Sequence, residues 1–216
     1  MSRYAVVDLE MCGVPKNRRN GYAFNQEIIE IGAVKLDDSF GIADEFKTFV
    51  APQYGFIDSY IQGLTGISNE DTAAAPVMEA ALEMFLEWLG EGTVMVAWST
   101  NDAYQLRTEA QLKGIESQTL DAVLEASVDS QMMFSEKMNT EKVYKLSEAL
   151  AIAGITYDEG AHEALVDARN TAMLFGKMMS DENFTLSPYI LNEASSKGGF
   201  SPFADLLAGF GTAVCC

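Results

Sequence analysis

The chain has 216 residues, of which 48% are hydrophobic and 21% charged, so it can bury a sizeable core and is not expected to be disordered. Its 32 acidic residues outweigh 14 basic ones, and the formal net charge of −18 excludes a broad, nonspecific grip on a polyanion. Any nucleic acid would have to be held locally, by metal ions and a few basic side chains. Lys16, Arg18 and Arg19 either supply such contacts or belong to a solvated loop.

Three strand-like segments open the chain, over residues 4–9, 27–36 and 45–50. The second alternates apolar residues with Glu30 and Gly32, which is the period of a strand with one buried and one exposed face. No helical pattern separates the three segments, so they predict an antiparallel meander.

Signals for helices follow the third strand. Ser68 with Asp71 three residues later resembles a capping box, and Pro76 suits the first turn of a second helix. This second helix is predicted to face the core with one apolar stripe, formed by Val77, Ala81, Met84, Phe85, Trp88 and Leu89. Gly90 ends the helix, and residues 93–98 then read as a buried strand.

The second half of the chain alternates helices with one more strand. The pattern predicts a helix from residue 101 to about 112, a strand over 123–128, a short helix, and a helix over 145–153. A long helix starts near Ala164 and carries Asp167 on its flank. Its predicted buried stripe consists of Leu165, Ala168, Ala172, Phe175 and Met179. The succession predicts an α/β fold, with helices flanking a mixed sheet of the antiparallel meander and parallel strands.

The pattern weakens toward the C-terminus. Residues 1–180 are predicted to form one domain, and residues 181–216 a C-terminal extension that is irregular apart from a short amphipathic helix over 201–210. The apolar side chains of this extension would pack onto the core or onto a second copy, which leaves a homo-oligomer as an alternative.

The cysteine content bears on the cellular compartment. Three cysteines, two of them adjacent at Cys215 and Cys216, offer neither a disulfide framework nor a metal-binding pair, and they indicate a reducing cytoplasm. Neither a signal peptide nor a membrane-spanning segment is apparent, so we expect no membrane partner.

Four acidic residues stand at places where ligands collect in α/β folds. Asp8 and Glu10, two apart at the end of the first strand, emerge on the same face and suit a hard cation such as Mg²⁺ or Mn²⁺. Asp102 opens a helix directly after a predicted strand, at the carboxyl edge of the sheet. Alone, the first two could be a solvated strand end, and Asp102 or Asp167 an ordinary helix residue.

The only histidine, His162, lies five residues before Asp167 and could reach the same cleft. The four carboxylates together would form a pocket able to hold two divalent ions, which clamp the attacking and leaving oxygens in phosphoryl transfer. An imidazole titrates near neutral pH and could take the proton of the attacking water. His162 alone would read as a helix-capping residue, but the acids favour a catalytic base.

Several motifs now become recognisable along residues 3–178. They are Val7-Asp8-Leu9-Glu10, the run QEIIEIGAV over residues 26–34, Leu64-Thr65-Gly66-Ile67, Asn101-Asp102, and His162 followed by Asp167. Together they resemble the DEDDh branch of the DnaQ-like 3′-5′ exonucleases, which implies an RNase H-like fold.

The resemblance also implies roles for individual residues. Asp8 would bridge two Mg²⁺ or Mn²⁺ ions, Glu10 and Asp167 would complete the first metal site, and Asp102 would support the second through water. His162 would be the general base. The backbone at Met11 and Cys12 and the side chain of Leu64 would lie against the 3′-terminal nucleotide.

The sequence therefore predicts a metal-dependent exonuclease that releases nucleoside 5′-monophosphates from single-stranded 3′ ends, with RNA or DNA left open. The alternative is a nucleic-acid-binding or protein-binding module that keeps the fold without the chemistry. Two features depart from the family pattern: the chain is unusually acidic, and the part after Asp181 matches none of it.

Overall fold

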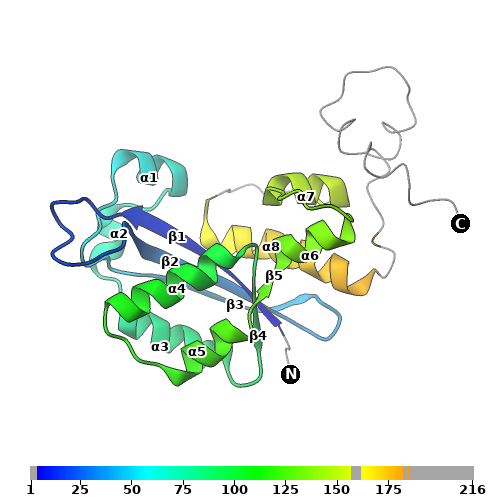
Figure 1. Ribbon diagram of the computed structural model, residues 1–216, viewed down its shortest axis with the longest axis horizontal. Helices are drawn as coiled ribbons and strands as arrows, with labels where there is room; N and C mark the ends of the chain where they lie inside the picture. The colour runs from blue at the N-terminus through cyan, green and yellow to red at the C-terminus, as the bar shows by residue number, and fades with distance from the viewer. Residues whose placement is uncertain (1–3, 157–161, 182–183, 185–216) are drawn as a thin grey trace, which may run out of the picture.

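The computed structural model describes residues 4–156, 162–181 and 184. Within these residues, one mixed sheet has the strand order β3-β2-β1-β4-β5 (Figure 1). The strands are β1 (Tyr4–Gly13), β2 (Gln26–Leu36), β3 (Ile42–Phe49), β4 (Val94–Ala97) and β5 (Val128–Asp129). The helices are α1 (Ser59–Thr65), α2 (Asn69–Ala73), α3 (Met78–Leu89), α4 (Thr100–Leu112), α5 (Gln118–Glu125), α6 (Ser130–Lys137), α7 (Leu146–Ala153) and α8 (Ala164–Ser180).

The topology confirms the predicted mixed sheet. β1, β2 and β3 pair antiparallel as a meander, whereas β4 pairs parallel with β1 and β5 parallel with β4. Each parallel strand is followed by a helix, α4 after β4 and α6 after β5, so both helices begin at the same edge of the sheet. The predicted capping box is also present, because the Ser68 and Asp71 side chains accept from each other's backbone at the start of α2.

Helices cover both faces of the sheet (Figure 1). One apolar layer packs Ala5 and Val7 of β1 against α3, α4 and α5, and the other packs Val6 against α6, α7 and α8. The prediction that β2 has one exposed face is therefore wrong: Glu30 has no exposed surface. The alternation in β2 predicted a half-buried strand, but helices cover both faces of the sheet at this strand.

Two local predictions were shifted or wrong. Of the strand predicted over 123–128, residues 123–125 belong to α5 and Val128 begins the short β5. The helix forms because Leu120 and Leu124 lie one turn apart and both face the core, while Ser117 caps it. The predicted stripe of α3 was right for Ala81, Phe85 and Leu89, which are buried, and wrong at two positions. Val77 precedes the helix and is 60% exposed, and Met84 is 47% exposed, whereas Met78 and Leu82 are buried.

The long helix shows a similar shift at its end, where Met179 is 37% exposed and Met178 takes the buried position. The predicted helix over 201–210 lies outside the described residues. Among the residues that are described, no helix has the length and apolar character needed to cross a bilayer.

Candidate active site

The candidate site is built on β1, whose alternation turns Asp8 and Glu10 toward the face that α8 covers. Asp8 lies opposite Gly32 of β2, and Glu10 lies opposite Glu30. The sequence predicted that the strand ends at these acids. In the structure it continues to Gly13, after a register shift between Glu10 and Met11. Such an irregularity bends a strand and redirects its side chains, and here it falls directly after the second carboxylate.

Gly32 allows α8 to reach the sheet beside Asp8. A Cβ atom on Gly32 would lie 2.3 Å from the backbone nitrogen of Leu165 and 2.4 Å from the carbonyl carbon of Ala164. Only glycine can accept backbone at that distance, so the first turn of α8 rests directly on β2. This contact carries Asp167, one turn into the helix, across to Glu10 on β1.

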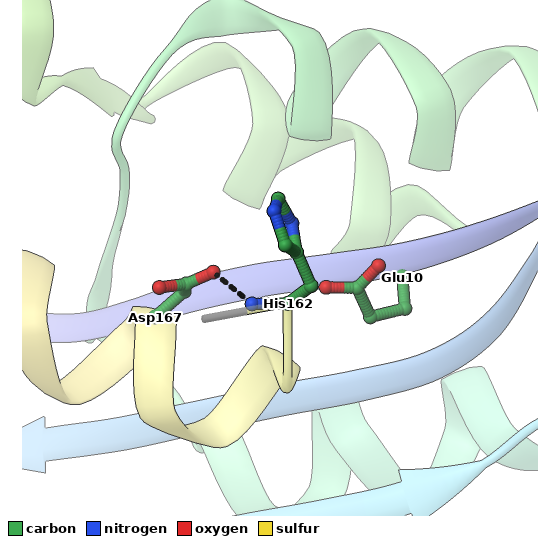
Figure 2. Close-up of side chains that lie close together, drawn as sticks. All are labelled: Glu10, His162 and Asp167. Atoms are coloured by element: carbon green, nitrogen blue, oxygen red, sulfur yellow. Dashed lines mark hydrogen bonds between the residues drawn. The ribbon is translucent and has the colours of Figure 1, made fainter. Parts of the chain in front are cut away.

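Glu10, His162 and Asp167 form a compact group (Figure 2). One ligand atom from each, a carboxylate oxygen or a ring nitrogen, lies within 4.8 Å of the corresponding atoms of the other two. The His162 backbone N–H donates to Oδ2 of Asp167 at 3.1 Å, and His162 is exposed, with a left-handed backbone at φ +70°. Figure 2 shows its side chain between the two carboxylates.

Asp102 joins the group through the parallel pairing of β1 with β4. Val7 lies opposite Ala97, the last residue of β4, so the chain leaves β4 next to Asp8 and then begins α4. The Ser99 side chain caps this helix, and Asp102 stands in its first turn. Its charge is one of those that raise the pKa of both Asp8 and Glu10.

The acids raise one another's pKa values. Burial, followed by the charges of Asp102, Asp167 and Glu10, raises the pKa of Asp8 well above its usual range. Burial and the neighbouring carboxylates raise the pKa of Glu10 to about 8, and burial raises that of Asp102 to about 7. Within the described part of the chain, no ion pair joins these three to a Lys or Arg. Uncompensated carboxylate oxygens of this kind are the donor set that hard divalent cations require.

Glu30 is a residue that the sequence analysis missed. It lies next to Glu10 across the strands, and the Lys47 ammonium from β3 lies 2.9 Å from its Oε1. The same ammonium lies 2.7 Å from Oε1 of Glu163, the residue between His162 and α8. Lys47 thus connects the sheet to the segment that carries His162. The interruption of an apolar run by Glu30 is the signal that the sequence offers, and its alternation predicts an exposed side chain instead of a buried one.

A second buried network positions the segment that leads to α1. The ammonium of Lys113, the residue that follows α4, lies 2.6 Å from Oε1 of Glu27 and 2.8 Å from Oε1 of Glu109, both fully buried. Glu27 also accepts from the backbone N–H groups of Gln53 at 3.1 Å, Tyr54 at 2.7 Å and Gly55. A buried charge is tolerated only when it is paired and hydrogen-bonded in this way. The network thereby fixes residues 53–55 against the end of β1.

The three residues predicted to contact a nucleotide differ in their surroundings. Met11 is partly buried, and Cys12 is 1% exposed, packed with Ile57 and Ile67. Burial, with the charge of Glu27, raises the pKa of the Cys12 thiol to about 12, so only its backbone is suited to a contact. Leu64 is 36% exposed on α1.

Comparison with known proteins finds relatives along most of the chain. Residues 5–175 match the model of a family named RNase T and described as Exonuclease. A PolC-type DNA polymerase III from Caldanaerobacter subterraneus subsp. tengcongensis is 34% identical over 177 residues, 82% of this chain but only 11% of that polymerase. The epsilon subunit of DNA polymerase III from Aquifex aeolicus is 28% identical over 179 residues, 82% of this chain and 81% of the subunit.

A solved structure has the same fold. The nuclease domain of 3′hExo, a DEDDh family member bound to rAMP, superimposes with a TM-score of 0.73 at 21% sequence identity. The superposition covers 86% of this chain and 96% of that domain.

Proposed function

Because the chain belongs to the RNase T exonuclease family, we propose that it is a metal-dependent 3′-5′ exonuclease that removes nucleoside 5′-monophosphates from single-stranded nucleic acid. The observation that carries the proposal is the close grouping of carboxylates around Asp8 and Glu10, with His162 beside them. The predicted RNase H-like fold is shared with the exonuclease neighbours.

In this proposal, Asp8, Glu10, Asp102 and Asp167 hold two Mg²⁺ or Mn²⁺ ions. When bound, such ions stabilise the attacking and leaving oxygens of an in-line displacement at phosphorus. His162 accepts the proton of the attacking water, and its exposure leaves room for that water between it and the terminal phosphodiester. The hydrogen bond from its backbone to Asp167 holds it at the carboxylates.

The 3′-terminal nucleotide would lie along the strand beyond Glu10, against the backbone of Met11 and Cys12 and the side chain of Leu64. The relatives do not decide between ribose and deoxyribose in the substrate, since two are DNA polymerase proteins and the structural neighbour is bound to rAMP. We therefore propose single-stranded 3′ ends as the substrate class, of RNA or DNA.

The catalytic domain would comprise residues 1–180, because the family match ends at residue 175 and α8 ends at Ser180. Residues 181–216 would be a separate extension, and its docking onto the core or onto a second copy remains a prediction. A cytoplasmic location likewise remains a prediction from the cysteine content.

The rival function is a binding module that has lost its chemistry. An inactive relative would be expected to lack at least one of the five residues, and this chain keeps Asp8, Glu10, Asp102, His162 and Asp167. The acids also remain next to one another, with no Lys or Arg paired to Asp8, Glu10 or Asp102 within the described residues. The catalytic reading is therefore favoured.

The test is hydrolysis of 5′-labelled single-stranded DNA and RNA in Mg²⁺, Mn²⁺ or chelator. Wild type should shorten the strand from its 3′ end only with a metal, and Asp8→Ala should abolish the reaction. His162→Ala should lower the rate by about 10² to 10⁴-fold, the usual contribution of a general base. The exposed Glu91 gives a matched control, and Glu91→Ala should retain wild-type activity.

Two results would contradict different parts of the proposal. If the wild-type protein leaves both strands intact in both metals, the exonuclease function is wrong. If His162→Ala matches the wild-type rate near neutral pH, the base assignment alone is wrong. Chromatography of the released nucleotides should identify 5′-monophosphates.

A further inference from the structure

The segments around the end of β1 are poor in acidic residues, although the whole chain has a net charge of −18. Asp58 is the single acid over residues 11–26 and 46–69, and its side chain accepts from the backbone N–H groups of Tyr60 and Ile61 at the start of α1. Lys16, Arg18 and Arg19 lie in the first of these segments. Elsewhere acids are frequent along the chain. This distribution makes one end of the sheet the place where a polyanion would meet the least repulsion.

These segments lie together in space. Gly13 at the end of β1 pairs with Phe56, and Val14 donates to the carbonyl of Asn25, which closes the β1–β2 loop. Ile61 of α1 packs onto the apolar group that contains Cys12. Figure 1 shows this loop on the same side of the molecule as α1 and α2. We call the loop over residues 14–25, the segment 51–57 and α1 the acid-poor rim.

The acid-poor rim presents aromatic rings to solvent beside a guanidinium group. Phe56 is 45% exposed and Tyr60 is 72% exposed, and Arg18 is exposed with its guanidinium carbon 5.2 Å from the centre of the Phe56 ring. The rings of Tyr22 and Tyr54 stack at 5.0 Å and join the loop to the segment before α1. This contact holds the two segments together, while Phe56 and Tyr60 keep much of their ring surface exposed.

We propose that Arg18, Phe56 and Tyr60 form a binding subsite for the nucleotides on the 5′ side of the residue to be removed. The inference rests on the proposed exonuclease function and extends it from the terminal nucleotide to the strand behind it. Exposed rings stack on unpaired bases of any sequence, and a neighbouring arginine binds their phosphates. This combination fits a single strand better than a protein partner.

The spacing along β1 agrees with this assignment. Gly13 is three residues beyond Glu10, and at about 3.3 Å per residue its backbone lies about 10 Å along the strand from that of Glu10. That length corresponds to about three stacked nucleotides at about 3.4 Å each. The Phe56 backbone paired with Gly13 is thus beyond the reach of the terminal nucleotide and within reach of those that precede it.

The experiment compares a long substrate with one that occupies the terminal subsite alone. The long substrate is a single-stranded oligonucleotide of about eight residues, and the short one is the p-nitrophenyl ester of thymidine 5′-monophosphate. Arg18→Ala and Phe56→Leu should each raise the KM for the oligonucleotide by about tenfold, the lower part of the range for loss of one stacking contact. Both variants should keep the wild-type KM and kcat for the ester.

Lys137→Ala is the matched control, because Lys137 is an exposed basic residue on α6, outside the acid-poor rim. This variant should leave the KM for both substrates unchanged. Equal KM values for the oligonucleotide in wild type and both rim variants would overturn the proposal, as would an equal effect of Lys137→Ala. Thermal melting of Phe56→Leu verifies that the variant is folded.

A binding measurement separates failure of the subsite from failure of the exonuclease function. Fluorescence anisotropy of the labelled oligonucleotide in chelator requires no hydrolysis. If the wild-type protein hydrolyses neither substrate but Arg18→Ala still weakens binding, the exonuclease function fails and the subsite stands. If binding is the same in all variants, the subsite is wrong, whatever the activity.

Discussion

The buried acids at the candidate site make the metal-free protein sensitive to pH. The pKa of Glu10 rises from 4.5 to about 8, and that of Asp102 rises from 3.8 to about 7. At a pH between the ordinary and the raised pKa of either group, the folded state binds more protons than the unfolded state. The free energy of unfolding therefore contains a contribution that is full below about pH 3.8 and is lost as the pH rises through about 7 for Asp102 and about 8 for Glu10.

This leads to a prediction about metal binding. Mg²⁺ replaces the bound protons, so it should raise the melting temperature more near pH 8 than near pH 6. The difference should be several degrees, because about 1 kcal/mol shifts the melting temperature of a chain of this size by about 2–4 °C. Thermal melting in chelator and in excess Mg²⁺ at both pH values measures it.

Asp8→Asn is the informative variant for that prediction, because it removes a central charge and keeps the side-chain shape. In chelator near pH 8 it should melt above wild type, and Mg²⁺ should no longer stabilise it. Glu91→Gln, on an exposed loop, should behave as wild type. A Mg²⁺ effect in Asp8→Asn equal to that of wild type would contradict the prediction.

The positions of some site residues could be predicted from the sequence, and those of others could not. The shared face of Asp8 and Glu10 follows from their two-residue spacing in any strand. The position of Asp102 follows from the strand and helix that flank it. The burial of Glu30 does not follow from β2 alone, because it depends on α8, which is distant in sequence, and on Lys47 from β3.

At the scale of elements, the presence of a helix or strand was easier to predict than which of its residues face the core. The meander and α8 were predicted from their periodicity and α4 from its start signal. The stripe of α3 was wrong at its first residue, because Val77 lies before the helix and bridges to Ala51 instead. The strand predicted over 123–128 overlaps the end of α5, because Val123, Leu124 and Val128 are apolar and two of them are β-branched. The helical state of α5 depends on packing against α4 and β4, which local pattern does not report.

The approach of α8 to β2 gives a prediction about Gly32. Gly32→Ala forces a Cβ atom into the backbone of Ala164 and Leu165, so the first turn of α8 must move away from the sheet. Asp167 would move with it, and a displacement of about 1 Å at a reacting group can cost about 10²-fold in rate. We expect a loss of that order in exonuclease activity, with destabilisation of about 1–3 kcal/mol from overpacking.

Gly41 in the β2–β3 turn provides the control. A Cβ atom there meets only the end of the Asp37 side chain, at 3.2 Å, and that side chain can move. Gly41→Ala should therefore keep its activity. Wild-type kcat in Gly32→Ala, measured on the labelled strand, would show that the close contact does not position Asp167.

At the scale of the whole molecule, the net charge of −18 limits how nucleic acid can bind. If contact with phosphates is confined to Lys16, Arg18 and Arg19, about three counterions are released, and log K should fall against log salt with a slope of about −2. Anisotropy of a labelled single strand in chelator, over about 25 to 200 mM KCl, gives this slope, and Arg18→Ala should make it shallower by about 0.7.

A wild-type slope steeper than about −4 would require more phosphate contacts than the acid-poor rim can offer. Affinity in this protein would then come from a basic surface elsewhere, so the slope separates local capture of a 3′ end from general attraction to a polyanion.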